Sequence, residues 1–296
     1  MTHFVKLFLI LSGFGMCCGY YVKFKEGKAD IEKFYKRRFS KNMPFFVLLV
    51  FIDTLVSIRG VIWRDVFASL TMAFNLMPTH DMSIVGVGWT LGAIFVFYFL
   101  FPFYVFLLST KKRAWCTAGI CLILNWCCCN YYEFVGKADG ANFLFLSVYF
   151  VVGGMIYLYK EDIEKKMRQV PVYVAILVIL LVTIVWYLIP SSEFSVWFTL
   201  KTIILFVVWI VAAISYKSKI LGNSITKKLS KVSLEIYLSH MMLFRVVEKI
   251  GFSNRITNKN ISYLTTLFFT IILTIIFSVF AKSVIDSCLR KLKNWR

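Results

Sequence analysis

The sequence predicts an all-α fold, a polytopic bundle of transmembrane helices, from its composition and the spacing of its apolar runs. Of 296 residues, 59% are apolar and only 17% are charged, and the mean hydropathy is +0.75. Soluble domains carry about a quarter charged residues, so this chain has too little polar surface to face water. The net charge of +19 does not predict a nucleic-acid partner, because the basic residues lie in short loops between apolar runs, as topology signals do.

Apolar windows recur along the whole chain, at 4–21, 44–62, 64–78, 86–108, 114–132, 141–159, 170–189, 196–215, 232–250 and 263–286. Crossing a bilayer core takes about 20 helical residues, and nine windows meet or approach that length. The window 64–78 would reach only about 22 Å at the helical rise of about 1.5 Å per residue. The first window lacks a good cleavage context for a signal peptide, so we expect it to stay in the protein as a helix. Lys6 lies near the outer end of this helix and can snorkel toward the membrane surface.

The charges of the loops indicate how the short window behaves. If 64–78 does not span, one side of the membrane receives 25 Lys and Arg residues and the other side receives seven. If it did span, every later loop would change sides and this asymmetry would vanish. The positive-inside rule therefore favours nine spanning helices plus one re-entrant or interfacial segment. It places the protein in the cell membrane with its N-terminus outside and its C-terminus in the cytoplasm.

Ionisable residues inside membrane helices are costly and often functional, and here they are Asp53, Lys201, Glu235 and His240. Asp53 has two open interpretations, which are pairing with a neighbouring cation and lining a wet cavity. Ser233, Tyr237 and His240 follow one another at i, i+4 and i+7 and therefore share one helix face. These three side chains are candidates for a site, although a lone buried histidine also occurs as a satisfied core residue.

The loop 22–42 concentrates basic residues and ends before Pro44, which suits the first turn of a helix. Arg38 and Lys41 stand at i and i+3 and would share a face. Such a pair could hold a phosphorylated cytoplasmic ligand. The alternative is an anchor that attracts anionic lipid and sets the topology.

Four stretches together resemble the acyltransferase 3 family, whose multi-pass membrane enzymes acylate envelope glycans. They occur in the family's order, as FLILSGF at 8–14, FYKRRFSKNMP at 34–44, GWTLGAIFVFYFLFP at 88–102 and SLEIYLSH at 233–240. Each motif alone is loose, but four in order are fairly specific. The acidic residue that commonly follows the family's Trp-Ser-Leu-Gly run is absent, with Ile94 in its place.

The resemblance implies transfer of an acyl group, commonly acetyl from acetyl-CoA, to a hydroxyl of an envelope glycan or exopolysaccharide. Acyl-CoA would be a co-substrate, with no tightly bound cofactor and no metal, and the acceptor would be a glycan or lipid-linked sugar. The family's two donor-binding arginines match Arg38 and Lys41, and Lys41 lacks the bidentate fork of the arginine that it replaces. We expect Arg37, beside Arg38, to bind the donor with them. The residues expected to line the pocket are Ser12, Trp89, Tyr98, Ser233 and Tyr237.

The chain departs from the family at its N-terminus, because the family's first helix, with its catalytic histidine, has no counterpart here. We therefore expect a single membrane-embedded domain, 1–296, that is shortened at its N-terminus, and an upstream coding frame of roughly 30 to 50 residues. If the chain acts as it stands, His240 is the candidate base. Two other interpretations remain: a transporter or glycan exporter, and a non-catalytic relic of the acyltransferase fold.

Overall fold

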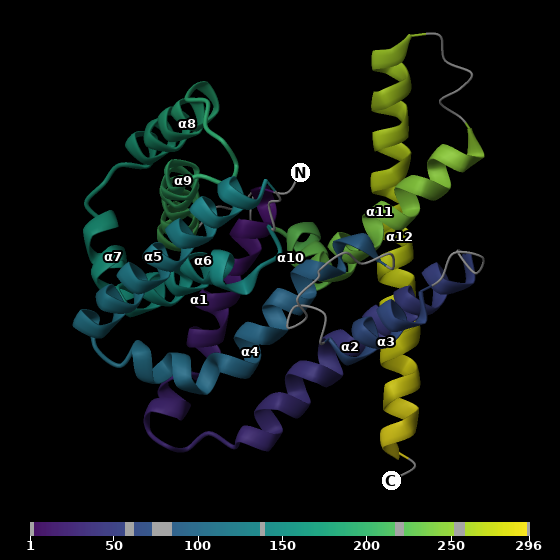
Figure 1. Cartoon of the computed structure of the whole chain (residues 1–296), viewed down its shortest axis with the longest axis horizontal. Helices are drawn as coiled ribbons and strands as arrows, with labels where there is room; N and C mark the ends of the chain where they lie inside the picture. The colour runs from purple at the N-terminus through teal and green to yellow at the C-terminus, as the bar shows by residue number, and fades with distance from the viewer. Residues whose placement is uncertain are drawn as a thin grey trace. The chain divides into compact units, whose positions relative to one another are not determined.

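The computed structural model describes residues 3–56, 62–72, 85–136, 140–216, 222–251 and 258–294 (Figure 1). Within these residues all regular structure is helical, which confirms the predicted fold class. The helices are α1 (His3–Lys25), α2 (Ile31–Val56), α3 (Trp63–Thr71), η3 (Gly86–Gly88), α4 (Trp89–Leu107), α5 (Lys111–Val135), α6 (Phe143–Leu158), α7 (Lys160–Met167), α8 (Val172–Leu188), α9 (Val196–Ser215), α10 (Ser224–Lys231), α11 (Ser233–Ile250) and α12 (Lys259–Asn294).

The lengths of the helices limit which of them can cross a membrane. Among the described residues, α1, α9, α12 and the segment Gly86–Leu107 are long and apolar enough to span. The pair α6 and α7, bent by 65°, passes the same test together, and α8 is a shorter apolar helix. The chain is thus a helical membrane protein, and the number of nine spans stays a prediction.

The described part of the short window 64–78 forms the short helix α3. Helix α3 has nine residues and so reaches about 14 Å, less than half of a bilayer core of about 30 Å. The rest of that window, 73–78, lies outside the described residues.

Helix α2 begins thirteen residues before the position that the sequence predicts for it, so the placement of Pro44 in a first turn is wrong. Asp30 accepts a hydrogen bond from the backbone N–H of Lys33 at 2.9 Å, and this cap starts the helix at Ile31. Pro44 then lies inside α2, as prolines do more often in membrane helices than in soluble ones. Because α2 is continuous there, the basic residues of 36–41 are on a helix and not in a loop.

The chain forms two compact units, one of Met1–Tyr35 with Ala93–Lys219 and the other of Lys36–Gly92 with Ile220–Arg296. In the first unit α1 and α6 pack backbone against backbone. A Cβ atom on Gly153 would lie 2.0 Å from the carbonyl oxygen of Ile10, and one on Gly13 would lie 2.2 Å from that of Phe150. Small residues permit such close crossings in membranes, so Gly13 of the stretch 8–14 has a packing role.

In the second unit α11 packs along α12. The hydroxyls of Ser239 and Ser278 lie 3.0 Å apart, and both side chains are fully buried. The short helix η3 also contacts α11. These contacts place the start of α4 and the middle of α11 in one packed unit.

Candidate functional site

The centre of the candidate site is a hydrogen bond between Thr90 and Tyr237 in the second unit. Thr90 Oγ1 and Tyr237 Oη lie 2.7 Å apart, and either hydroxyl can donate. Thr90 is the second residue of α4 and is 1% exposed, whereas Tyr237 is on α11. The two residues come from the stretches 88–102 and 233–240, so folding joins two of the four motifs at one point.

His240 lies beside this pair on α11. Its Nδ1 atom is 2.5 Å from the carbonyl oxygen of Tyr237, and the two rings have centroids 5.5 Å apart. A carbonyl can only accept, so Nδ1 carries a proton and, in the neutral ring, Nε2 has the free lone pair. The half-buried imidazole therefore keeps Nε2 as the ring nitrogen that can accept a proton.

The sequence left two roles open for Asp53, pairing with a cation or lining a wet cavity, and in the structure Asp53 pairs with a cation. Its carboxylate is 4% exposed, accepts from the guanidinium of Arg245 at 3.2 Å and accepts from the backbone N–H of Val85 at 2.9 Å. Val85 has φ = 44°, a left-handed conformation that is costly for a β-branched residue. Asp53 thus connects α2, α11 and a strained backbone position that lies five residues before Thr90.

Glu235 and Ser233 make structural contacts. The Lys282 ammonium on α12 lies 2.5 Å from Glu235 Oε1, which ties the start of α11 to α12. The Ser233 hydroxyl donates to the carbonyl of Ser230 at 3.1 Å, where α10 meets α11. Of the three residues predicted to share a face, Tyr237 and His240 make the contacts described above, whereas the Ser233 hydroxyl bonds to a carbonyl only three residues away.

The predicted donor-binding residues lie on α2 in the second unit. Arg37 and Lys41 are exposed and Arg38 is half-buried. Their spacings of three and four residues put them on one helix face. Asp53 follows Lys41 by twelve residues, which is about 18 Å along the helix axis.

The remaining predicted pocket residues divide between the units. Trp89 begins α4 in the second unit and is half-buried, beside Thr90. Ser12, half-buried on α1, and Tyr98, 8% exposed on α4, belong to the first unit.

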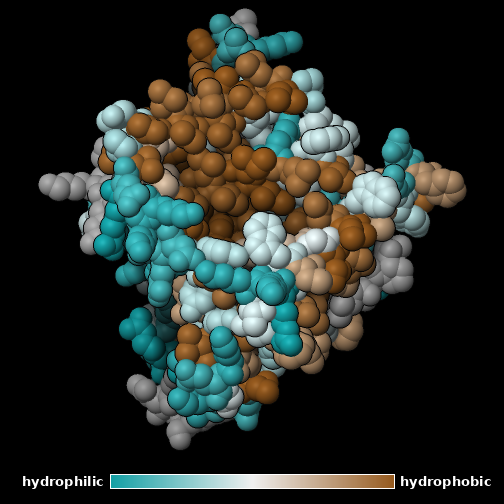
Figure 2. Space-filling model, turned by 90° about the vertical axis from the view of Figure 1, so that its left-hand side faces the viewer, coloured by the Kyte–Doolittle hydropathy of each residue, from teal (hydrophilic) through white to brown (hydrophobic). Residues whose placement is uncertain are grey.

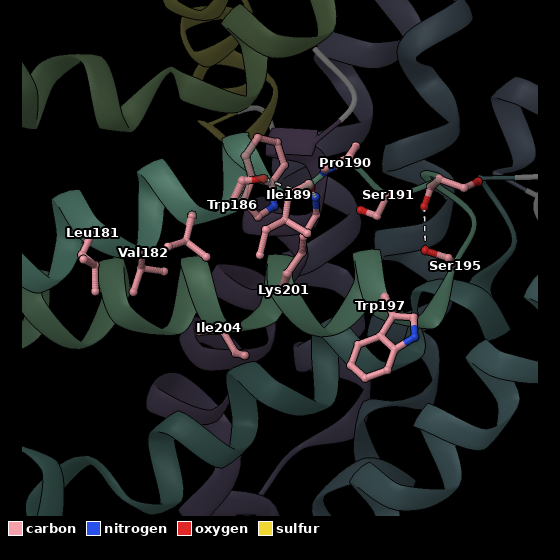
Figure 3. A pocket seen from close by; sticks show the side chains of 12 residues that line it. Leu181, Val182, Trp186, Ile189, Pro190, Ser191, Ser195, Trp197, Lys201 and Ile204 are labelled. Atoms are coloured by element: carbon pink, nitrogen blue, oxygen red, sulfur yellow. Dashed lines mark hydrogen bonds between the residues drawn. The ribbon is translucent and has the colours of Figure 1, made fainter.

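A cavity of about 600 Å³ lies between α8 and α9 in the first unit (Figure 3). Lys201 is at this cavity and donates to the carbonyls of Ile189 at 2.6 Å and Trp186 at 3.2 Å. It therefore satisfies backbone carbonyls at the C-terminal end of α8, as basic side chains do at helix C-termini. The charge of Lys201 inside the predicted membrane helix therefore has a structural role that requires no catalytic function.

Lys6 does not snorkel, contrary to the sequence prediction. It is 4% exposed, its Nζ lies 3.5 Å from Glu193 Oε1, and it lies 4.2 Å from the ring centroid of Phe198. A carboxylate and a ring face together compensate for its burial. Glu193 lies 187 residues further along the chain, so no local pattern could have indicated this pair.

Comparison with known proteins gives one family. The search of curated proteins found no match, and neither did the search of solved structures. The family described as an acyltransferase domain matches residues 3–282. This range covers all four motif stretches and extends over both units. The chain therefore belongs to the acyltransferase 3 family.

Proposed function

We propose that this chain is a membrane O-acyltransferase that moves an acyl group, acetyl in the first instance, from cytoplasmic acyl-CoA to a hydroxyl of an envelope glycan, an exopolysaccharide or a lipid-linked sugar. Membership of an acyltransferase family supports the reaction type. The observation that carries the proposal is the 2.7 Å bond between Thr90 and Tyr237, beside an imidazole whose Nε2 can accept a proton. Acyl-CoA acts as a co-substrate, and no tightly bound cofactor or metal is required.

The proposed chemistry uses His240 as general base and then as general acid. Nε2 takes the proton of the acceptor hydroxyl while the oxygen attacks the thioester carbonyl, and the carbon–sulfur bond breaks. The CoA sulfur leaves with the proton that Nε2 received. Products are the glycan ester and free CoA. Thr90 and Tyr237 act as positioning residues, because their bond fixes the part of α11 that carries His240.

Arg37, Arg38 and Lys41 are proposed to bind the phosphates of the donor. Replacing Arg38 with Ala is expected to weaken acyl-CoA binding by about 1.5–3 kcal/mol, the range for hydrogen bonds to charged groups. Titration calorimetry with acetyl-CoA would measure this as a loss of roughly 10- to 150-fold. Wild-type binding should also weaken steeply with added salt.

Lys36 provides a matched control for the donor site. It is exposed on the same helix, but it stands five residues before Lys41, about 140° around the helix. It therefore lies away from the face that Lys41 shares with Arg37 and Arg38. Lys36→Ala should bind acetyl-CoA like the wild type. If Arg38→Ala binds acetyl-CoA as tightly as the wild type, or if Lys36→Ala loses as much affinity as Arg38→Ala, the donor site is not here. The basic residues of 36–41 would then serve only to set the membrane topology.

The proposed orientation places the N-terminus outside and α10 in the cytoplasm. In a background without the eight native cysteines, a cysteine at the exposed Ser192 should react with an impermeant thiol reagent on intact cells. A cysteine at the exposed Ser230 should react only after the cells are opened. Labelling of Ser230→Cys on intact cells would contradict the nine-span topology and the cytoplasmic position of the donor residues.

A further inference from the structure

A second cavity in the first unit is lined by other residues than those proposed for acyl transfer. It measures about 540 Å³ and lies between α5, α6 and α9. Ligand pockets typically measure about 300–1,000 Å³ and are mostly apolar. The side chains along its length are apolar: Leu122, Val148, Val152, Leu200, Ile203 and Val207.

Gly119 on α5 keeps this groove open. A Cβ atom at Gly119 would meet nothing within 4 Å, so the absence of a side chain there leaves space beside the exposed backbone. Helix α9 is among the helices able to cross a membrane. Figure 2 faces the side on which α7 and α8 lie and shows a broad hydrophobic area beside a hydrophilic band. A groove in such a surface is accessible to lipid chains.

One end of the groove is polar and aromatic. Asp162 and Lys166 of α7 line it there, together with Trp115 and Tyr159. The indole N–H of Trp115 donates to the Tyr159 hydroxyl at 2.9 Å. Tryptophan and tyrosine in this arrangement are typical of the boundary between the hydrocarbon core and the headgroups.

The same end of the groove has an excess of positive charge. The segments 111–113 and 160–168 contain seven Lys and Arg residues against three Asp and Glu residues. Two ion pairs form within these segments, Lys111 with Asp162 at 2.6 Å and Lys160 with Glu164 at 3.8 Å. Among the residues that the structure describes, four basic side chains of these two segments make no direct ion pair: Lys112, Lys165, Lys166 and Arg168. Of these four, Lys166 lines the groove itself.

We propose that this groove is a binding site for an anionic phospholipid. One acyl chain occupies the apolar length of the groove beside Gly119, and the phosphate lies among Lys112, Lys166 and their basic neighbours. Basic pockets between membrane helices select anionic headgroups because the attraction adds to the burial of the chain. A zwitterionic lipid gains the burial and little of the attraction. This proposal does not depend on the proposed reaction.

The test uses the full chain purified in mild detergent with equal amounts of phosphatidylglycerol and phosphatidylcholine. Mass spectrometry of retained lipid should show phosphatidylglycerol enriched about tenfold over phosphatidylcholine. Gly119→Phe, which fills the groove, and the double variant Lys112→Glu with Lys166→Glu should each remove most of this enrichment. The two variants act on different parts of the site, so a folding defect in one leaves the other informative.

Two matched controls are available in the chain. Gly15 on α1 also has nothing within 4 Å of a built Cβ, and Lys228 is an exposed basic residue on α10. Gly15→Phe and Lys228→Glu should retain the wild-type enrichment. Equal retention of both lipids by the wild type, equal loss in the controls, or displacement of the lipid by a long-chain acyl-CoA at equimolar concentration would each overturn the proposal.

Discussion

Replacing His240 with Gln is expected to lower acyl transfer by about 10²- to 10⁴-fold, the contribution typical of a general base. Glutamine has a similar volume and keeps an amide that can donate a hydrogen bond, but it cannot accept a proton from the acceptor hydroxyl. Binding of acetyl-CoA should stay at the wild-type level, because the donor is proposed to be held on α2. The measurement is release of free CoA from acetyl-CoA by purified protein in the presence of a glycan acceptor.

His3 provides the control for this substitution. It belongs to the first unit, where its ring contacts those of Trp186 and Phe198, and it has no assigned role in transfer. His3→Gln should keep the wild-type rate. Full activity in His240→Gln would show that the base lies elsewhere. If the wild type itself transfers no acyl group yet binds acetyl-CoA, the non-catalytic interpretation is the correct one.

The sequence predicts the helices well because the bilayer requires long apolar runs, and their hydropathy is visible in any window of the chain. It missed α7 and α10, whose local signals are polar. Glu161 and Asp162 stand in the first turn of α7 and Lys165 and Lys166 in its last turn, an order that favours a helix. A search for apolar windows does not detect such helices.

The contacts of the candidate site could be predicted only in part. The order of the motifs indicated that the stretches 88–102 and 233–240 belong together, and the bond between Thr90 and Tyr237 joins them. The partner of Asp53 is 192 residues away in the chain. Periodicity reports which face of a helix a residue occupies, whereas the choice of partner depends on tertiary packing.

Replacing Lys282 with Ala is expected to destabilise the second unit by about 3–5 kcal/mol, the cost of leaving one member of a buried pair uncompensated. The side chain of Glu235 is only 8% exposed and that of Lys282 is 24% exposed, so solvent screens this pair weakly. Lys282 also donates to the carbonyl of Lys231, and the variant loses that bond as well. Thermal unfolding of the purified protein would show the loss as a lowered melting temperature.

The double variant Lys282→Ala with Glu235→Gln separates charge from packing. A neutral amide costs far less to bury than a carboxylate, so the double variant should recover most of the stability that Lys282→Ala loses. Lys291→Ala, an exposed position on the same helix, should unfold like the wild type.

If the double variant is as unstable as Lys282→Ala, the packing of the lysine stem stabilises α11 on α12, and the buried carboxylate is not the cause of the loss. If it recovers, the charge of Glu235 is what requires Lys282. The same pair would then fix the start of the helix that carries Tyr237 and His240, and Lys282→Ala should also lower acyl transfer without touching the reacting atoms.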